Sequence, residues 1–216
     1  MAKLGFIGLG SMGAPMAANL LAAGHELAVY ARRPEAARPL LSAGAVLCQS
    51  PREVAARSDV VFTMVTDTAA VETVVLGASG VAEGARPGLV VIDHSTISPS
   101  GAQRVAAALE ERGMHMLDAP VSGGVAAARA ATLSIMVGGD EETFVRCRPL
   151  LAQLGSTIVR VGPSGAGQVA KACNQICIVV NQLGVAEAIL LAERSGVDFE
   201  PIKAALLGGF EASRIL

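Results

Sequence analysis

Three glycines near the start of the chain have the spacing that a phosphate-binding turn requires. They stand as G-x-G-x-x-G over residues 8–13, after the apolar run Lys3–Ile7 and before a segment with helical periodicity. This order predicts a strand, a tight turn and a helix whose unpaired N-terminal N–H groups face a pyrophosphate. The first glycine would allow the turn, the second would let phosphates approach, and the third would let the helix pack closely on the strand. The residues of this predicted dinucleotide site are Gly8, Leu9, Gly10, Ser11, Met12 and Gly13.

The apolar stretch over residues 5–24 also resembles the core of a signal peptide. Its glycines would break a signal helix, however, and a single lysine precedes it. A strand follows where a cleavage site of small residues would stand. We therefore prefer the dinucleotide interpretation.

The residues after the second predicted strand, Glu26–Ala31, favour NADP over NAD. An NAD site usually has Asp or Glu near the end of this strand, where the carboxylate binds the ribose 2′-OH. Here Ala31 holds that place and is followed by Arg32 and Arg33. Arginine can pair with a 2′-phosphate through its planar, charged fork. The alternative is that the two arginines are solvated turn residues.

Two later predicted strands, Asp59–Val65 and Gly88–Asp93, end in residues that we expect beside the cofactor, because loops after strand carboxyl ends line the ligand crevice. These residues are Val65 and Thr66 at the first strand and Ser95 and Thr96 after the second. Asp67 or Thr68 could also cap the following helix. His94 has no carboxylate or nucleophile at a recognisable spacing, so we expect it to be structural or merely near the site.

A run of small residues, Asp-Ala-Pro-Val-Ser-Gly-Gly over 118–124, follows the predicted strand Met114–Leu117. Backbone N–H groups and a serine hydroxyl can close around a carboxylate where no bulky side chain intervenes. A flexible glycine-rich loop is the alternative, but it would not call for Asp-Ala-Pro before it. Ser122, Gly123 and Gly124 are therefore candidates for binding a substrate carboxylate.

A long, largely apolar helix predicted at Gln168–Arg194 carries polar residues near its start. Lys171, Asn174 and Gln175 fall at i, i+3 and i+4 and share a face. Such a lysine usually reaches solvent with its stem buried. Facing a nicotinamide crevice, it could instead donate a proton, with its pKa lowered by burial. Two cysteines on this helix, Cys173 and Cys177, are expected to be free, buried thiols.

The elements that must position these residues alternate between strands and helices as far as Val161, which indicates an α/β fold with a sheet covered on both faces. The glycine-rich segment over 162–167 is the best domain boundary, and the pattern beyond it is helical only. We expect a dinucleotide-binding domain over residues 1–163 and the start of a helical domain over 164–216.

The composition argues against several other classes of protein. The net charge of −2, with one Tyr, five Phe and no Trp, is atypical of a nucleic-acid binder. Asn181, Gln182 and Glu187 interrupt the most apolar late segment, so we expect no membrane span. The cysteine spacing requires neither an oxidising compartment nor a metal, and we expect a cytoplasmic protein without a metal site.

Four motifs spread in order over almost the entire chain resemble those of the β-hydroxyacid dehydrogenase family, which includes 3-hydroxyisobutyrate dehydrogenases and tartronate semialdehyde reductases. They are residues 8–13 with Pro15-Met16, residues 118–124, the turn Gly165-Ala166-Gly167, and Lys171-Ala172-Cys173-Asn174-Gln175. The resemblance implies a Rossmann-like domain followed by an all-helical one, which is incomplete here. It also implies a homodimer or homotetramer formed through the helical domain.

The resemblance implies an NAD(P)-dependent oxidoreductase that transfers a hydride between the cofactor and a small 3-hydroxy acid or its semialdehyde. By the same resemblance Lys171 is the general acid/base, Asn174 and Gln175 position the substrate, and residues 122–124 hold its carboxylate. The chemistry is consistent, because the nicotinamide carries the hydride and the protein must orient the carbonyl and supply one proton.

Three features depart from the family pattern. Ala131 stands where a glycine usually precedes Thr-Leu, Thr66 stands where many members have proline, and the chain ends at Leu216 where relatives continue with helices that complete the active site. A non-catalytic NAD(P)-binding module therefore stays an alternative. An imine reductase is a further one, although Lys171 argues against it, and Asn174-Gln175 argues against a sugar-phosphate dehydrogenase.

Overall fold

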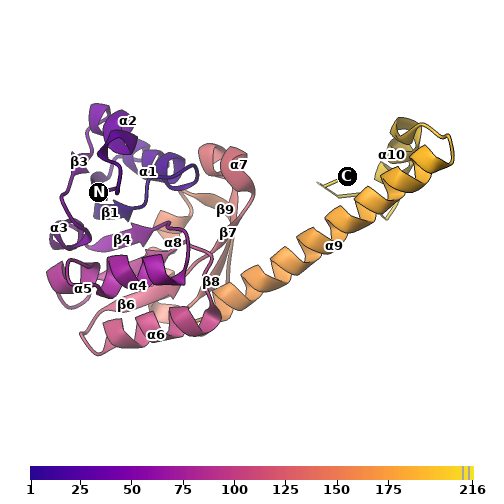
Figure 1. Ribbon diagram of the computed structural model, residues 1–216. Coiled ribbons are helices and arrows are strands. Elements are labelled where there is room, and N and C mark those ends of the chain that lie inside the picture. The colour runs from indigo at the N-terminus through magenta and orange to yellow at the C-terminus, as the bar shows by residue number, and fades with distance from the viewer. Residues whose placement is uncertain (211, 214) are drawn as a thin grey trace. The chain divides into compact units, whose positions relative to one another are not determined.

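The computed structural model of the chain describes residues 1–210, 212–213 and 215–216, and contacts between residues divide it into two units. The first unit is Met1–Lys171 and the second is Ala172–Leu216. Figure 1 shows the chain as a ribbon with most of its helices and strands labelled. The domain boundary predicted between residues 163 and 164 stays a prediction.

The first unit alternates strands and helices along the chain. Its strands are β1 (Lys3–Ile7), β2 (Glu26–Tyr30), β3 (Val46–Leu47), β4 (Val60–Thr63), β5 (Val90–Asp93), β6 (His115–Asp118), β7 (Val121–Ser122), β8 (Leu133–Gly138) and β9 (Gly155–Gly162). Its helices are α1 (Gly13–Ala22), the 3₁₀ helix η1 (Pro34–Ala37), α2 (Arg38–Ser42), α3 (Pro51–Ala56), α4 (Thr68–Leu76), α5 (Val81–Gly84), α6 (Pro99–Glu110), α7 (Gly124–Ala130) and α8 (Glu141–Leu151). The helix α9 (Ala166–Arg194) begins in the first unit and continues into the second, which also contains α10 (Phe199–Leu207).

The strands form one mixed sheet in the order β3-β2-β1-β4-β5-β6-β8-β7, with β9 paired to β8. The strands from β3 to β6 along this order are parallel, whereas β8 runs antiparallel to β6 and β7. The order 3-2-1-4-5-6 is that of dinucleotide-binding sheets, with a switch point between β1 and β4. The predicted α/β, Rossmann-like fold is therefore confirmed.

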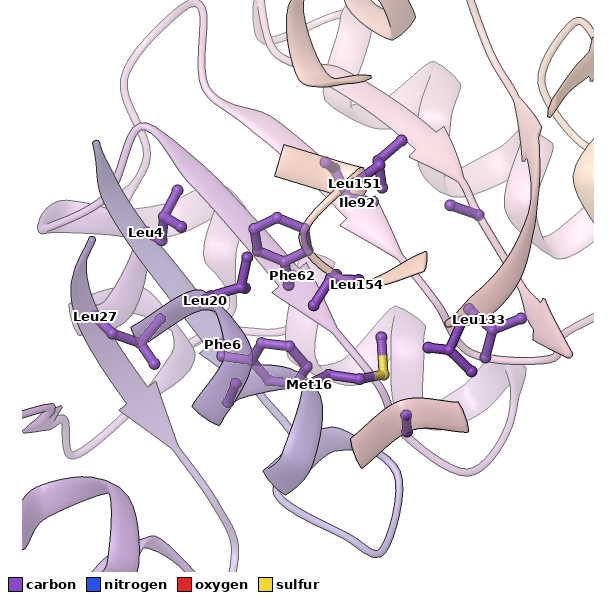
Figure 2. Close-up of a cluster of buried hydrophobic side chains, with 14 of the residues drawn as sticks. Leu4, Phe6, Met16, Leu20, Leu27, Phe62, Ile92, Leu133, Leu151 and Leu154 are labelled. Atoms are coloured by element: carbon purple, nitrogen blue, oxygen red, sulfur yellow. The ribbon is translucent and has the colours of Figure 1, made fainter. Parts of the chain in front are cut away.

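Both faces of the sheet are covered, as the alternation of strands and helices predicts. Successive strand residues point to opposite faces, so Phe62 packs in one core cluster and Val61 in the other. The first cluster takes side chains from α1, α2, α7 and α8, and Figure 2 shows Phe6, Met16 and Leu20 grouped with Phe62 in it. The second cluster takes side chains from α3 to α6.

Several elements add detail to the sequence expectation. Within residues 118–124, Val121 and Ser122 form the short strand β7 because they pair with Ile135 and Ser134 of β8, and Gly124 begins α7. The segment between β2 and β3 forms two short helices, η1 and α2. Asp67 does cap α4, since its carboxylate accepts a hydrogen bond from the N–H of Ala70 at 2.8 Å.

The part of α9 in the second unit bears on two expectations, and one of them is wrong. Cys173 and Cys177 are exposed and not buried, because among the described residues no second layer of side chains packs on this part of the helix. By length and composition alone α9 is apolar enough to cross a membrane, so Asn181, Gln182 and Glu187 do not by themselves exclude a span. The core helix of a soluble protein passes the same test, and the expectation of no membrane span stays a prediction.

Candidate active site

A cavity of about 460 Å³ lies where β1, β2 and β4 end, at the switch point of the sheet. It is lined by the predicted cofactor residues Gly8, Leu9, Gly10, Ser11, Met12, Gly13, Ala31, Arg32, Arg33, Val65 and Thr66. Ser95 and Thr96, also predicted, do not line it. The structure therefore brings three of the four predicted groups of cofactor residues to one cavity.

The three motif glycines meet different steric demands. A Cβ at Gly8 would collide with the backbone oxygen of Met64, and Gly8 also has a φ of +97°. A Cβ at Gly13 would collide with the backbone oxygen of Gly8. A Cβ at Gly10 would meet no atom within 4 Å, so the space in front of this residue is open to a ligand. The loop thus fits a dinucleotide pyrophosphate in the way that the motif predicts.

The cavity has further walls that the sequence analysis did not identify. Ala70, Thr73 and Val74 contribute one face of α4, whereas Tyr30 is the last residue of β2 and Met64 directly follows β4. The i, i+3, i+4 spacing on α4 is a signal that could have found the first three. Tyr30 and Met64 immediately precede residues that were predicted, and shifting the strand ends by one residue would have included them.

Arg32 lines the cavity, and Asp67, which has the opposite charge, follows the lining residue Thr66. The pKa of Asp67 is lowered by hydrogen bonds from the Ala70 N–H and the Thr66 hydroxyl, and to a smaller extent by the positive charge of Arg32. The side chains of Arg32 and Arg33 are exposed to solvent. They are accordingly free to meet an anionic group that enters the cavity.

Ser95 lies behind the cavity wall and not in it. Its hydroxyl oxygen accepts a hydrogen bond from the N–H of Val65 at 2.9 Å, and the residue is completely buried. Thr96 is exposed. Ser95 therefore supports a residue that lines the cavity.

Asp118 anchors the beginning of α9. This buried carboxylate accepts hydrogen bonds from the N–H of Gly165 at 2.8 Å and of Gln168 at 3.0 Å. Burial raises its pKa, and these backbone hydrogen bonds oppose the rise. A Cβ at Gly167 would collide with the backbone oxygens of Asp118 and Met136, which explains why a glycine stands there. The same aspartate begins the segment that leads to residues 122–124.

Lys171 follows one helical turn after this anchor. It is only 9% exposed, and it lies at i+3 from Gln168, which is 2% exposed, so the two share a buried face of α9. Desolvation by burial lowers the pKa of Lys171. Its ammonium group therefore gives up a proton more readily than that of a surface lysine.

The segment proposed to hold a carboxylate has a half-buried serine and two exposed glycines. Ser122 is the last residue of β7, and Gly123 and Gly124 adopt φ values of +128° and +67°. Such left-handed conformations favour glycine, because a Cβ is strained there. Asn174 and Gln175 belong to the second unit, where Asn174 is half-buried and Gln175 is exposed.

His94 is structural. It is completely buried, its Nδ1 donates to the backbone oxygen of Ala119 at 2.6 Å, and its ring stacks on Phe62. Burial lowers its pKa to about 4. The imidazole is therefore neutral near pH 7.

Residues 3–162 match the family model described as the NAD binding domain of 6-phosphogluconate dehydrogenase, and residues 165–216 match that described as NAD-binding of NADP-dependent 3-hydroxyisobutyrate dehydrogenase. The 2-hydroxy-3-oxopropionate reductase of Escherichia coli K12 is 49% identical over 214 residues, which are 99% of this chain and 73% of that protein. The chain belongs to the β-hydroxyacid dehydrogenase family.

Solved structures agree with this membership of the β-hydroxyacid dehydrogenases. The structure of Mycobacterium tuberculosis 3-hydroxyisobutyrate dehydrogenase with L-serine is 42% identical, has a TM-score of 0.92, and matches 100% of this chain and 73% of its own. The Streptomyces aurantiacus imine reductase has a TM-score of 0.83 over 95% of this chain and 74% of its own, but at 24% identity it shows a common fold only. The protein is an NAD(P)-dependent oxidoreductase of small hydroxy acids or their semialdehydes.

Proposed function

We propose that this β-hydroxyacid dehydrogenase reduces a small semialdehyde that carries a carboxylate, or oxidises the matching 3-hydroxy acid, with Lys171 as general acid/base. The observation that carries the proposal is the position of Asp118. This one residue anchors the helix turn before Lys171 and begins the segment that ends in Ser122, Gly123 and Gly124. The carboxyl end of β6 would thus position both a proton donor and a carboxylate-binding segment.

The cofactor would occupy the cavity at the end of β1, with its pyrophosphate over Gly10. When bound, the nicotinamide supplies or accepts the hydride. Arg32 and Arg33 are exposed at the cavity wall beside Ala31, which supports a preference for NADP, since a guanidinium pairs well with a 2′-phosphate. Ser95 would contribute from behind the wall by holding Val65, and Thr96 would contribute from its exposed position as the next residue of the loop.

The substrate would be held by its carboxylate and protonated at its carbonyl oxygen. The hydroxyl of Ser122 and the N–H groups of Gly123 and Gly124 would bind the carboxylate, and Asn174 and Gln175 would orient the rest of the substrate. The lowered pKa of Lys171 supports its role, because a general acid works best when its pKa lies near the operating pH. In the oxidation direction the neutral amine would take the hydroxyl proton.

The substrate class is tested by a screen. The full chain is assayed for oxidation of NADPH and of NADH with C3 and C4 semialdehydes, with and without a carboxylate. The proposal expects turnover of acid semialdehydes, faster with NADPH, and at most slow turnover of the aldehydes that lack a carboxylate. Tight cofactor binding with no turnover of any aldehyde would favour a cofactor-binding module, and turnover of cyclic imines alone would favour an imine reductase.

We also propose a cytoplasmic homodimer or homotetramer formed through the helical second unit. Large apolar side chains of α9, including Val179, Val180 and Leu183, are at least 60% exposed within the single chain, and burying them against a second copy would remove this surface from water. Light scattering after size-exclusion chromatography should give two or four times the mass of the chain. A monomer at micromolar concentration would contradict this.

A further inference from the structure

The side chain of Gln168 joins the first turn of α9 to the loop that follows β5. Its amide Nε2 donates to the backbone oxygen of Ser95 at 2.8 Å, and its Oε1 accepts from the N–H of Ile97 at 3.0 Å. The residue is 2% exposed, so both hydrogen bonds are shielded from water. A buried primary amide whose N–H and carbonyl oxygen both form hydrogen bonds fixes the distance between the two segments that it joins and their relative rotation.

The main chain of the same residue is held independently by the neighbouring strand. The N–H of Gln168 donates to the carboxylate of Asp118, which also accepts from Gly165. The beginning of α9 is thus connected to the end of β6 by backbone groups and to the loop after β5 by one side chain. Removing that side chain would leave the Asp118 connection in place and release the other.

The connection through Gln168 continues to the cofactor cavity. The backbone carbonyl of Ser95 accepts a hydrogen bond from the side-chain amide of Gln168. The hydroxyl oxygen of Ser95 accepts another from the N–H of Val65. Val65 lines the cavity. A continuous series of hydrogen bonds, buried at Gln168 and partly buried at Val65, therefore links the cavity wall to the helix turn that precedes Lys171.

We propose that Gln168 is a positioning residue for proton transfer, which sets the ammonium group of Lys171 at a fixed place relative to the cofactor cavity. The inference rests on the proposed role of Lys171. Misplacement of a reacting group by about 1 Å can lower a rate about 100-fold. Loss of Gln168 should therefore lower kcat and leave cofactor binding nearly unchanged, since the residue itself does not line the cavity.

The experiment compares Gln168→Met and Gln168→Glu with Gln103→Met in the full chain. Methionine keeps the volume and removes both hydrogen bonds, whereas glutamate keeps the acceptor for Ile97. Gln103 is a matched control, because its exposed amide donates to Ser164 in the loop before α9. We expect kcat for semialdehyde reduction to fall about 10- to 100-fold in Gln168→Met, less in Gln168→Glu and less than about twofold in Gln103→Met.

The pH profile separates positioning from a merely structural role. If the turn loosens, Lys171 becomes more hydrated and its pKa rises, so the alkaline limb of kcat for reduction should move to higher pH in Gln168→Met. Asp118, which faces the same turn, is unchanged in every variant. An unaltered kcat per folded molecule with an unmoved limb in Gln168→Met would overturn the proposal. Where Gln168→Met does not fold, an unaltered kcat in Gln168→Glu overturns it, because a carboxylate three residues before Lys171 moves the limb by its charge alone.

The Lys171→Ala variant distinguishes this proposal from the proposed function. Wild-type turnover in Lys171→Ala would refute the role of the lysine and with it the positioning role of Gln168. Loss of turnover in Lys171→Ala, together with normal kinetics in Gln168→Met, would refute the positioning role alone.

Discussion

At the scale of single residues, the site depends on burial and on steric room more than on the number of charged groups. Gly10 leaves open space where the other two motif glycines are in close contact with backbone, and burial lowers the pKa of Lys171. The sequence motifs singled out both residues as candidates. They could not identify Gln168, whose partners are more than 70 positions away in the chain.

The cofactor preference depends on residue 31. Replacing Ala31 with Asp places a carboxylate at the cavity wall, where it would repel a 2′-phosphate and accept hydrogen bonds from a free ribose. We expect the ratio of kcat/KM for NADPH to that for NADH to fall by about tenfold or more, equivalent to ~1.4 kcal/mol. Ala31→Asn is the uncharged control, and an equal ratio in wild type and Ala31→Asp would contradict our interpretation of the arginines.

His94 should make the protein sensitive to acid. Its folded-state pKa of about 4 lies below its ordinary value of 6.5, so its contribution to stability is present above pH 6.5 and is lost as the pH falls toward 4. Asp93 acts in the opposite sense, because burial raises its pKa to about 6 and its protonation on acidification favours the folded state.

Comparison with His94→Asn isolates the histidine, since Asp93 is present in both proteins. The difference in free energy of unfolding between wild type and variant should shrink by on the order of 3 kcal/mol from pH 7 to pH 4. Urea denaturation at several pH values measures it. A difference that stays constant with pH would show that His94 does not titrate in this way.

At the scale of elements, most helices and strands could be predicted from periodicity and from capping residues. β7 could not, because two residues are too short to show a pattern, and their pairing with β8 decides their conformation. The same holds for the exposure of Cys173 and Cys177, because helical periodicity places them on one face but does not say whether another element covers that face.

Ala131, which directly follows α7, has a strained backbone conformation, and it stands where the family usually has glycine. Ala131 has a φ of 55° and a ψ of 35°, and it is the one non-glycine residue with positive φ in the part of the chain that the structure describes. Alanine in this left-handed region costs roughly 1–2 kcal/mol, which glycine avoids.

We therefore expect Ala131→Gly to stabilise the protein by about 1 kcal/mol after the greater flexibility of glycine in the unfolded chain is subtracted. Ala126→Gly, within the same helix and exposed, should instead destabilise it by roughly 0.5–1 kcal/mol. Thermal unfolding of the two variants beside wild type tests this. Equal losses in both would mean that position 131 is not strained.

At the scale of the whole molecule, the alternation of strands and helices was enough to predict a sheet covered on both faces, because each strand contributes side chains to two cores. The sequence indicates less about the second unit, whose apolar helix has few partners among the described residues. Which faces of this helix are buried depends on contacts with other segments, and helical periodicity alone does not specify these contacts.

The central claim is that Lys171 transfers the proton. The direct test is kcat for semialdehyde reduction in Lys171→Met, with Lys3→Met, at the exposed start of β1, as the matched control. We predict that kcat falls about 10²- to 10⁴-fold in Lys171→Met and is unchanged in Lys3→Met, while the Kd for NADPH changes less than about twofold in both. A Lys171→Met variant that keeps the wild-type kcat would contradict the account.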